Sequence, residues 1–337
     1  SKQASKQASK QASKQASKQA SKQASKRLVY MDVFRGIGII LMIMGHIGFG
    51  REFSHFIHAF HMPMFFFISG FFYRKKDGEV CTVVAKKIKT LLIPYMIFAL
   101  AHWLIFVILN GFSIEPLLHV ITINTSGLPI AGALWFLTAL FFTDIIYFLF
   151  DRWNVKWLIF SFALVGSFAN QILQYTLPWA LSASFVGLGL YWLGEWSRKH
   201  EDKFKILLNM NVWQILVIGI LTTGLIFING YVNMREGSYA IIPLFWINAL
   251  LAIYLGISIS KIICKRFKVE WIASIGKNSI VYVCMNQIVI MGVSAVLRYI
   301  ISSGIVIRLF TLGSSLIVLY CLSLIFTKTR LRILVGK

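Results

Sequence analysis

The chain has 337 residues, of which 58% are apolar and 14% charged, and its mean hydropathy is +0.73. A soluble domain carries about a quarter charged residues, so this composition excludes a soluble protein. The 34 Lys and Arg outnumber the 12 Asp and Glu, but they stand between long apolar runs, which excludes the continuous basic face of a nucleic-acid-binding protein. This arrangement is typical of an integral membrane protein, whose main surroundings are the lipid bilayer.

Residues 1–27 are a basic, low-complexity tail that begins with repeated copies of Ser-Lys-Gln-Ala. The repeat has no apolar side chain larger than Ala, so it cannot bury a core. It is typical either of a disordered tail near an anionic membrane surface or of an artefactual stretch of sequence. We therefore predict one transmembrane domain over residues 28–337 and give the tail no catalytic role.

Long apolar stretches fill the rest of the chain. A transmembrane helix needs about 20 mostly apolar residues. The sequence therefore predicts an all-α, polytopic membrane protein with about ten transmembrane helices. These stretches cover residues 33–50, 54–73, 90–109, 131–150, 157–173, 178–197, 209–230, 239–260, 278–297 and 305–327.

The distribution of Lys and Arg predicts the orientation of these helices. Loops on one side carry most of the basic residues, including those at 74–89, 198–205 and 261–268, whereas the opposite loops carry little more than Arg51, Arg235 and Arg298. Basic loops stay in the cytoplasm. Both termini are therefore predicted to be cytoplasmic.

The first predicted helix carries Arg35 near its start and His46 near its end. The two residues are eleven positions apart, which brings them within about 20° of the same face and separates them by about 16 Å along the helix axis. A titratable group at mid-membrane depth is costly and is usually functional. The alternative is a structural one, in which Arg35 reaches the membrane surface or pairs with Asp32, and His46 is held by hydrogen bonds.

Two further polar features lie inside predicted spans. His58 and His61 are three residues apart and share a helix face, but no carboxylate or Cys accompanies them at ligand spacing, so we predict no metal site. Asp144 lies deep in its span. It is either a functional acid or a protonated one that hydrogen-bonds Thr138, Thr143 or Tyr147.

Several motifs, in this order and in a ten-span context, resemble acyltransferase family 3, a family of integral membrane O-acyltransferases. The resemblance runs from about residue 29 to the C-terminus, and within the family it is nearest the fucose 4-O-acetylase-like subgroup. The motifs are Arg35-x10-His46, FHMPMFFFISGF at 60–71, RKK at 74–76, KKIKTLLIPY at 86–95, LWFL at 134–137 and IGKNS at 275–279.

The resemblance implies transfer of an acyl group, usually acetyl in this family, from a cytosolic acyl-CoA to a hydroxyl of a cell-surface glycan or lipid-linked glycan precursor. No permanently bound cofactor is implied, since acetyl-CoA is a co-substrate, and the location implied is the bacterial cytoplasmic membrane. His46 would be the catalytic general base. Arg35, Arg74 and Lys75 would bind the CoA phosphates. Substrate-binding or supporting positions would be Asp32, His61, Ser69, Trp135, Asn278, Ser279 and Asn286.

One position departs from the family pattern. Where relatives often carry a His after the Gly-x-x-Ser element, this chain has Asn286 and Gln287. An amide can hydrogen-bond a substrate but cannot shuttle a proton. This departure favours a mechanism with His46 as the main base.

Two other functions fit the same composition. A transporter of a glycan, amino acid or lipid-linked intermediate would also have many spans, glycine-rich helices and polar midplane residues. A component of a polysaccharide export system without activity of its own is the third alternative.

Overall fold

The computed structural model of the chain describes residues 29–75, 78–122, 124, 132–173, 175, 177–302 and 304–336. The predicted tail over residues 1–27 lies outside these ranges. Within them the protein is helical, and its β structure is limited to one isolated pair of bridging residues, Asn233 and Ser238. The prediction of an all-α protein is confirmed.

The helices follow one another with short connections. The first helix covers Val29–Ile47. After it come α2 (Arg51–His58), α3 (His61–Phe71), α4 (Val80–Lys87), the π-helical turn η1 (Ile88–Leu92), α5 (Ile93–Asn110) and α6 (Glu115–Thr122). The second part of the chain contains α7 (Trp135–Arg152), α8 (Leu158–Leu173), η2 (Pro178–Ala180), α9 (Leu181–Lys199), α10 (Val212–Asn229), η3 (Met234–Glu236), α11 (Ile242–Arg266), α12 (Glu270–Lys277), α13 (Ser279–Leu297), α14 (Gly304–Lys328) and η4 (Arg330–Val335).

Six helices among the described residues are long and apolar enough to cross a membrane, namely the first helix, the continuous helix Val80–Asn110, α10, α11, α13 and α14. Helix α10 has a mean hydropathy of 1.9, although only 17% of its apolar window is buried inside the protein. A helix that is apolar on its outer face as well as its inner face needs lipid around it. The chain is therefore a multi-pass membrane protein. The predicted spans 131–150, 157–173 and 178–197 are helical in α7, α8 and α9, but these helices are not among the six.

The single helix predicted over residues 54–73 is wrong. The chain turns at Ala59 and Phe60, which separates α2 from α3. Pro63 therefore stands in the first turn of α3 and not in a helix interior. A proline has no N–H to donate, and in a first turn that loss costs nothing because the N–H has no partner there. The break turns α2 away from the axis of α3.

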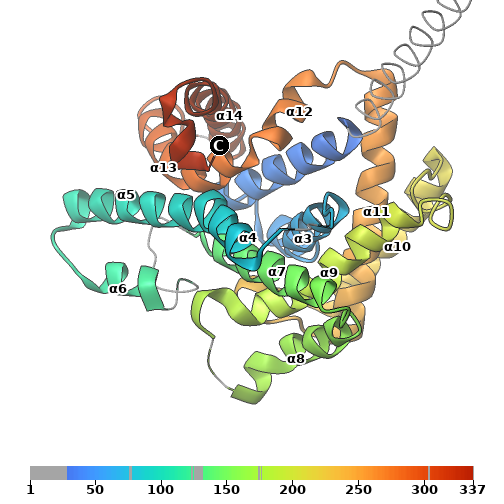
Figure 1. The fold of residues 1–337 in the computed structure, drawn as a ribbon. Coiled ribbons are helices and arrows are strands. Elements are labelled where there is room, and N and C mark those ends of the chain that lie inside the picture. Colours follow the sequence, from blue (N-terminus) through green and yellow to red (C-terminus); the bar gives the residue numbers. More distant parts are fainter. Residues whose placement is uncertain are drawn as a thin grey trace, which may run out of the picture.

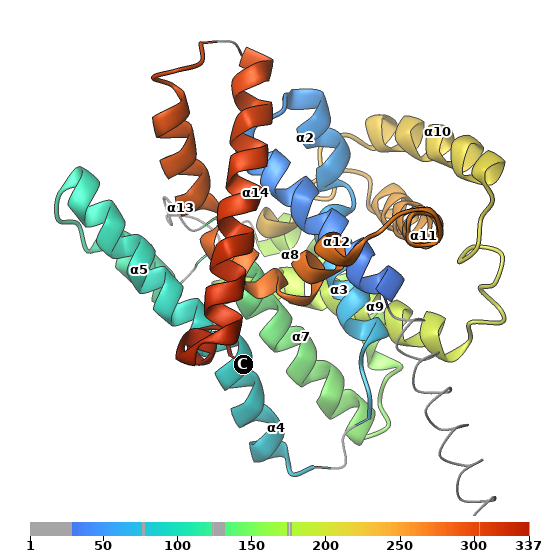
Figure 2. The ribbon, with the colours of Figure 1, turned by 90° about the horizontal axis from the view of Figure 1, so that it is seen from above.

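The first helix lies inside the bundle (Figures 1 and 2). It contacts three other elements through glycines. Gly36 lies against Ile272 of α12, Gly38 lies against Met64 and Phe65 of α3, and Gly256 of α11 lies against Phe34. A Cβ at Gly276 would lie 1.9 Å from the carbonyl oxygen of Asp32. Because glycine has no side chain, the backbones approach closely and fix the direction of the first helix. Both views place α5 and α10 at the edge of the molecule.

Helices α3 and α9 make a second close contact. A Cβ at Gly70 would lie 1.9 Å from the carbonyl oxygen of Tyr191, and one at Gly194 would lie 2.0 Å from that of Phe67. Small residues at such crossings are the usual means of tight helix association in membranes.

We predict that Gly194→Ala separates α3 from α9 and lowers the free energy of unfolding by about 1–3 kcal/mol, the usual cost of overpacking. The control is Gly224→Ala in α10, because a Cβ there meets no atom within 4 Å. Thermal unfolding of the detergent-solubilised protein measures the difference. Equal melting temperatures for the two variants would contradict this packing.

Candidate functional site

A small cavity with both polar and apolar walls lies at the end of the first helix that carries His46. We call it the His46 cavity. Its volume is about 140 Å³. It is lined by residues of the first helix, the α2–α3 segment, the start of α7, the turn at η3 and α13. The polar, charged and aromatic side chains in its wall include those of His46, His58, His61, Trp135, Arg235 and Glu236.

His46 is held by a chain of two hydrogen bonds. The backbone N–H of Gly132 donates to Gln287 Oε1 (2.7 Å), so the amide nitrogen of Gln287 faces His46 Nδ1 at 3.2 Å. An amide nitrogen only donates, which makes Nδ1 the acceptor and leaves the proton of the neutral ring on Nε2. His46 is also exposed to the cavity. The basic lone pair of His46 is therefore on Nδ1, where it accepts one long hydrogen bond from Gln287.

His58 and His61 stand beside His46 in the cavity, with their ring centres 4.9 Å apart. Nδ1 of His58 lies 2.7 Å from the carbonyl oxygen of Ser54, and Nδ1 of His61 lies 2.8 Å from that of Ile57. Each ring therefore donates from Nδ1 and keeps its lone pair on Nε2. No group of three metal-ligating side chains occurs in the described ranges.

Arg35 lies at the other end of the first helix, and it does not line the His46 cavity. Its guanidinium carbon is 5.1 Å from the ring centre of Phe72, which immediately follows α3. Between the two ends, Gly38 packs on Met64 and Phe65. Arg35 and His46 thus both face the α2–α3 segment, and packed apolar side chains separate them.

The other predicted residues at this basic end have local partners. The ion pair of Asp32 is with Lys277, at 4.0 Å, and the two described residues Asp32 and Arg35 form none with each other. Asn278 and Ser279 form the junction between α12 and α13 beside the start of the first helix. Ser69 donates to the carbonyl oxygen of Phe65 in its own helix (2.8 Å).

Arg74 and Lys75 follow α3 and are exposed. Neither lines the His46 cavity. Their position is consistent with contact to a soluble anion at the protein surface. Their role as CoA-binding residues stays a prediction.

Asn286 and Gln287 occupy different environments. Asn286 is buried and donates to the carbonyl oxygens of Tyr282 and Val283 in its own helix (2.9 and 2.8 Å). Gln287, the next residue, is the one that reaches His46. The sequence alone does not show which of the two amides contacts His46, because it does not determine which face of α13 packs against the first helix.

A second polar network lies away from the cavity, between α4, α7 and α9. Lys87 and Tyr191 both bind the carboxylate of Asp144, the hydroxyl of Tyr191 at 2.7 Å. The alternative of a protonated Asp144 bonded to Thr138, Thr143 or Tyr147 is therefore wrong. Asp144 is an ion-paired carboxylate that joins three helices.

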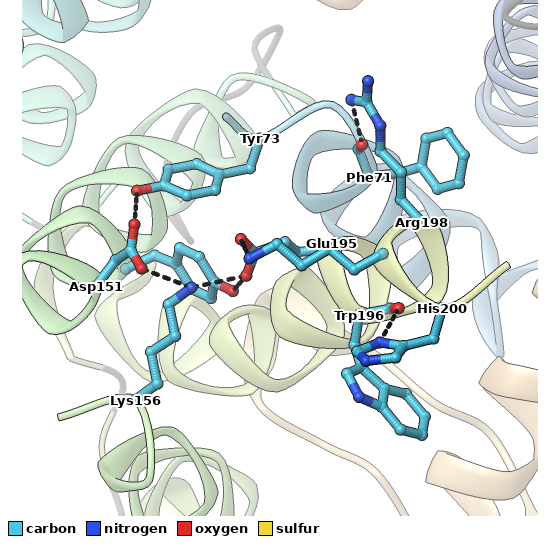
Figure 3. A network of polar contacts seen from close by, with 10 residues as sticks. Phe71, Tyr73, Asp151, Lys156, Glu195, Trp196, Arg198 and His200 are labelled. Atoms are coloured by element: carbon cyan, nitrogen blue, oxygen red, sulfur yellow. Dashed lines mark hydrogen bonds and ion pairs between the residues drawn. The ribbon is translucent and has the colours of Figure 1, made fainter. Parts of the chain in front are cut away.

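Lys156 occupies the centre of the same region (Figure 3). Its ammonium group lies 2.7 Å from Asp151 and 2.8 Å from Glu195, and Tyr73 and Tyr147 donate to these two carboxylates. Asp151 lies just beyond the predicted span 131–150. Burial raises the pKa of Asp151, but the hydrogen bonds from Lys156 and Tyr73 lower it by more, so that it lies below the ordinary value of 3.8. A carboxylate whose pKa is lowered by folding stabilises the folded state at pH values above about 3.8. This stabilisation is lost as the pH falls through the lowered pKa and the carboxylate becomes protonated.

Comparison with known proteins identifies the class of molecule. The chain belongs to acyltransferase family 3, since the model of that family's acyltransferase domain matches residues 28–327. The chain is therefore a membrane acyltransferase by family, and this membership does not favour a transporter. Searches among curated proteins and among solved structures give no match.

The predicted site residues did not include Gln287, which contacts His46, or Arg235 and Glu236, which line the cavity. Gln287 could have been suspected because it is a polar residue in an apolar span. Arg235 and Glu236 carried no such signal, because charged residues in a loop between spans are ordinary. Only the folded chain brings this turn to His46.

We predict that Lys156→Met leaves Asp151 and Glu195 without their shared cation. The side chains of Lys156, Asp151 and Glu195 are 23%, 13% and 6% exposed. Removing one partner of a fully buried pair costs about 3–5 kcal/mol, so we expect about 2–3 kcal/mol here. Denaturation at neutral pH measures the loss, which shrinks below about pH 4 as Asp151 becomes protonated.

Lys199→Met is the matched control for this variant. Lys199 also binds Glu195 (2.7 Å), but its side chain is 60% exposed. A surface ion pair contributes about 0–1 kcal/mol. If both variants lose equal stability, Lys156 is not the centre of the network.

Proposed function

We propose that the protein is an acyl-CoA-dependent O-acyltransferase, with acetyl as the transferred group and a glycan hydroxyl as the acceptor. The observation that carries the proposal is the His46 cavity, in a chain of an acyltransferase family, at the end of a helix whose other end carries Arg35. The proposed topology has about ten spans in the bacterial cytoplasmic membrane, with both termini in the cytoplasm. The excess of Lys and Arg on the side of Arg74 and Lys75 supports it.

The donor enters from the basic end. Arg35, Arg74 and Lys75 supply cations for the phosphates of CoA, and Arg35 is already oriented by its contact with Phe72. The pantetheine arm then follows the first helix towards His46. Met64 and Phe65 pack on Gly38 along this path, so they move aside to admit the arm. Methionine is well suited to this because its side chain is unbranched and adaptable.

The chemical step is a direct transfer assisted by His46. The acceptor hydroxyl takes the place of the Gln287 amide at Nδ1, where the single 3.2 Å bond is weak. His46 accepts the hydroxyl proton while the oxygen attacks the thioester carbonyl. The C–S bond breaks, the ester forms, and the sulfur leaves as the CoA thiol after taking that proton from His46.

The acceptor approaches from the opposite end of the bundle. A hydroxyl of a cell-surface glycan or lipid-linked glycan precursor can hydrogen-bond the imidazoles in the cavity wall, and Trp135 offers an aromatic face beside them. The cavity is smaller than the about 300–1,000 Å³ of usual ligand pockets. This size suits the reacting ends of two substrates that arrive from opposite sides. We propose a place in the fucose 4-O-acetylase-like subgroup on the motif resemblance alone.

We predict that His46→Ala lowers acyl transfer by about 10²–10⁴-fold, the usual contribution of a general base, while acetyl-CoA still binds. The assay follows labelled acetyl groups from acetyl-CoA into envelope glycans in membrane vesicles. His200→Ala is the control, because His200 faces the carbonyl oxygen of Trp196 in its own helix and does not line the cavity. Unchanged acetylation in His46→Ala would remove the proposed base.

We predict that Arg35→Gln raises the KM for acetyl-CoA by about tenfold to a hundredfold with little change in kcat, because a charge-assisted contact to phosphate is lost. Steady-state kinetics in vesicles measure both constants. Arg266→Gln, at the exposed basic end of α11, removes the same charge away from the first helix and should change neither. A fall in kcat with unchanged KM would instead place Arg35 outside the donor site.

A further inference from the structure

The turn around η3 covers the His46 cavity from the end opposite Arg35. Asn233 and Ser238 exchange two backbone hydrogen bonds (2.7 and 3.0 Å) across it. Gly237 has φ of 67°, which favours glycine, and a Cβ there would lie 2.3 Å from Nδ2 of Asn170, the residue that also donates to the carbonyl oxygen of Glu236. The turn is thus closed by its own bonds and anchored to α8.

This turn presents Arg235 to the cavity. Arg235 is half-buried and lines the same cavity as His46. Its Nε is buried and has no hydrogen-bond partner among the described residues. No ion pair of Arg235 occurs within those residues either. A buried donor of a charged group that stays unpaired is costly, so the arrangement calls for an acceptor from outside the chain.

Acceptors line the cavity near Arg235, but none of the described ones reaches its Nε. Glu236 also lines the cavity and its carboxylate attracts the guanidinium of Arg235, but Glu236 is exposed and the two side chains form no ion pair. His58 and His61 keep acceptor lone pairs on Nε2, but neither accepts a hydrogen bond from Nε of Arg235. The remaining lining near Arg235 is aromatic or apolar, as at Trp135 and Met234.

We propose that Arg235 is an anion-binding site for the acceptor, so that the preferred acceptor sugar carries an oxyanion, either a carboxylate or a phosphate. The guanidinium group is planar and binds both kinds of oxyanion through paired N–H groups. Held there, the sugar places a nearby hydroxyl at His46. The inference rests on the proposed function and adds to it the chemical class of the acceptor.

The test compares three probes with the full-length protein in detergent: glucose, glucuronate and glucose 6-phosphate. Saturation-transfer NMR gives their affinities without any need for catalysis. The wild-type protein should bind at least one charged sugar more tightly than glucose. Arg235→Gln should lower the affinity for that charged sugar by about tenfold to a hundredfold, which is the contribution of one charge-assisted contact. The affinity for glucose should stay unchanged.

Two further variants make the result specific. Arg298→Gln removes the same charge from the exposed C-terminal end of α13 and should change no affinity. Arg235→Lys keeps the charge but loses the paired N–H groups, so it should have an intermediate affinity for the charged sugar. If Arg235→Gln does not fold, Arg235→Lys replaces it in the comparison with the wild-type protein. Preference for glucuronate alone identifies a carboxylate, and preference for glucose 6-phosphate alone identifies a phosphate.

Several outcomes would overturn the inference. These are equal affinity of the wild-type protein for all three sugars, binding of none of them, or a loss in Arg235→Gln that is the same for glucose as for the charged sugars. The inference fails independently of the proposed function. His46→Ala should lower transfer by about 10²–10⁴-fold yet keep the preference for the charged sugar. A preference for the charged sugar in a wild-type protein that shows no acyl transfer would support the anion site and contradict the proposed function.

Discussion

The fold depends on one constraint, which is that polar side chains inside an apolar bundle must find their partners within the protein. Asp144 meets this constraint through Lys87 and Tyr191, and Glu195 meets it through Lys156, Lys199 and Tyr147. Apart from the Lys199–Glu195 pair within α9, these bonds join segments that are distant in the sequence. They stabilise the bundle because an unpaired charge there would cost several kcal/mol.

In the His46 cavity, polar side chains are only partly paired within the protein. His46 has a single long hydrogen bond at Nδ1, and Arg235 has a buried Nε without a partner in the described part of the chain. Groups left incompletely paired in a cavity are available to substrates. The same argument explains why the network around Lys156, although more highly charged, is structural: each of its carboxylates already has partners.

Glycine packing connects the fold to the site. The first helix can carry His46 to the cavity only because Gly36, Gly38 and Gly276 let it pass close to α12 and α3. The break between α2 and α3 then brings His58 and His61 to the same point. The direction of one helix and the position of one turn thus determine which imidazoles meet.

The amino-acid sequence determined the class of this protein, its helical content and the helix faces of Arg35 and His46, because these depend on composition and on the local period of the helix. It also placed His61 and Trp135 among the candidate residues. Tertiary structure decided what local periodicity cannot: that Gln287 and not Asn286 meets His46, that Asp144 binds Lys87, and that the turn carrying Arg235 covers the cavity. These are contacts between segments 50 to more than 200 residues apart, and they depend on how helices cross and on which faces of them are brought together.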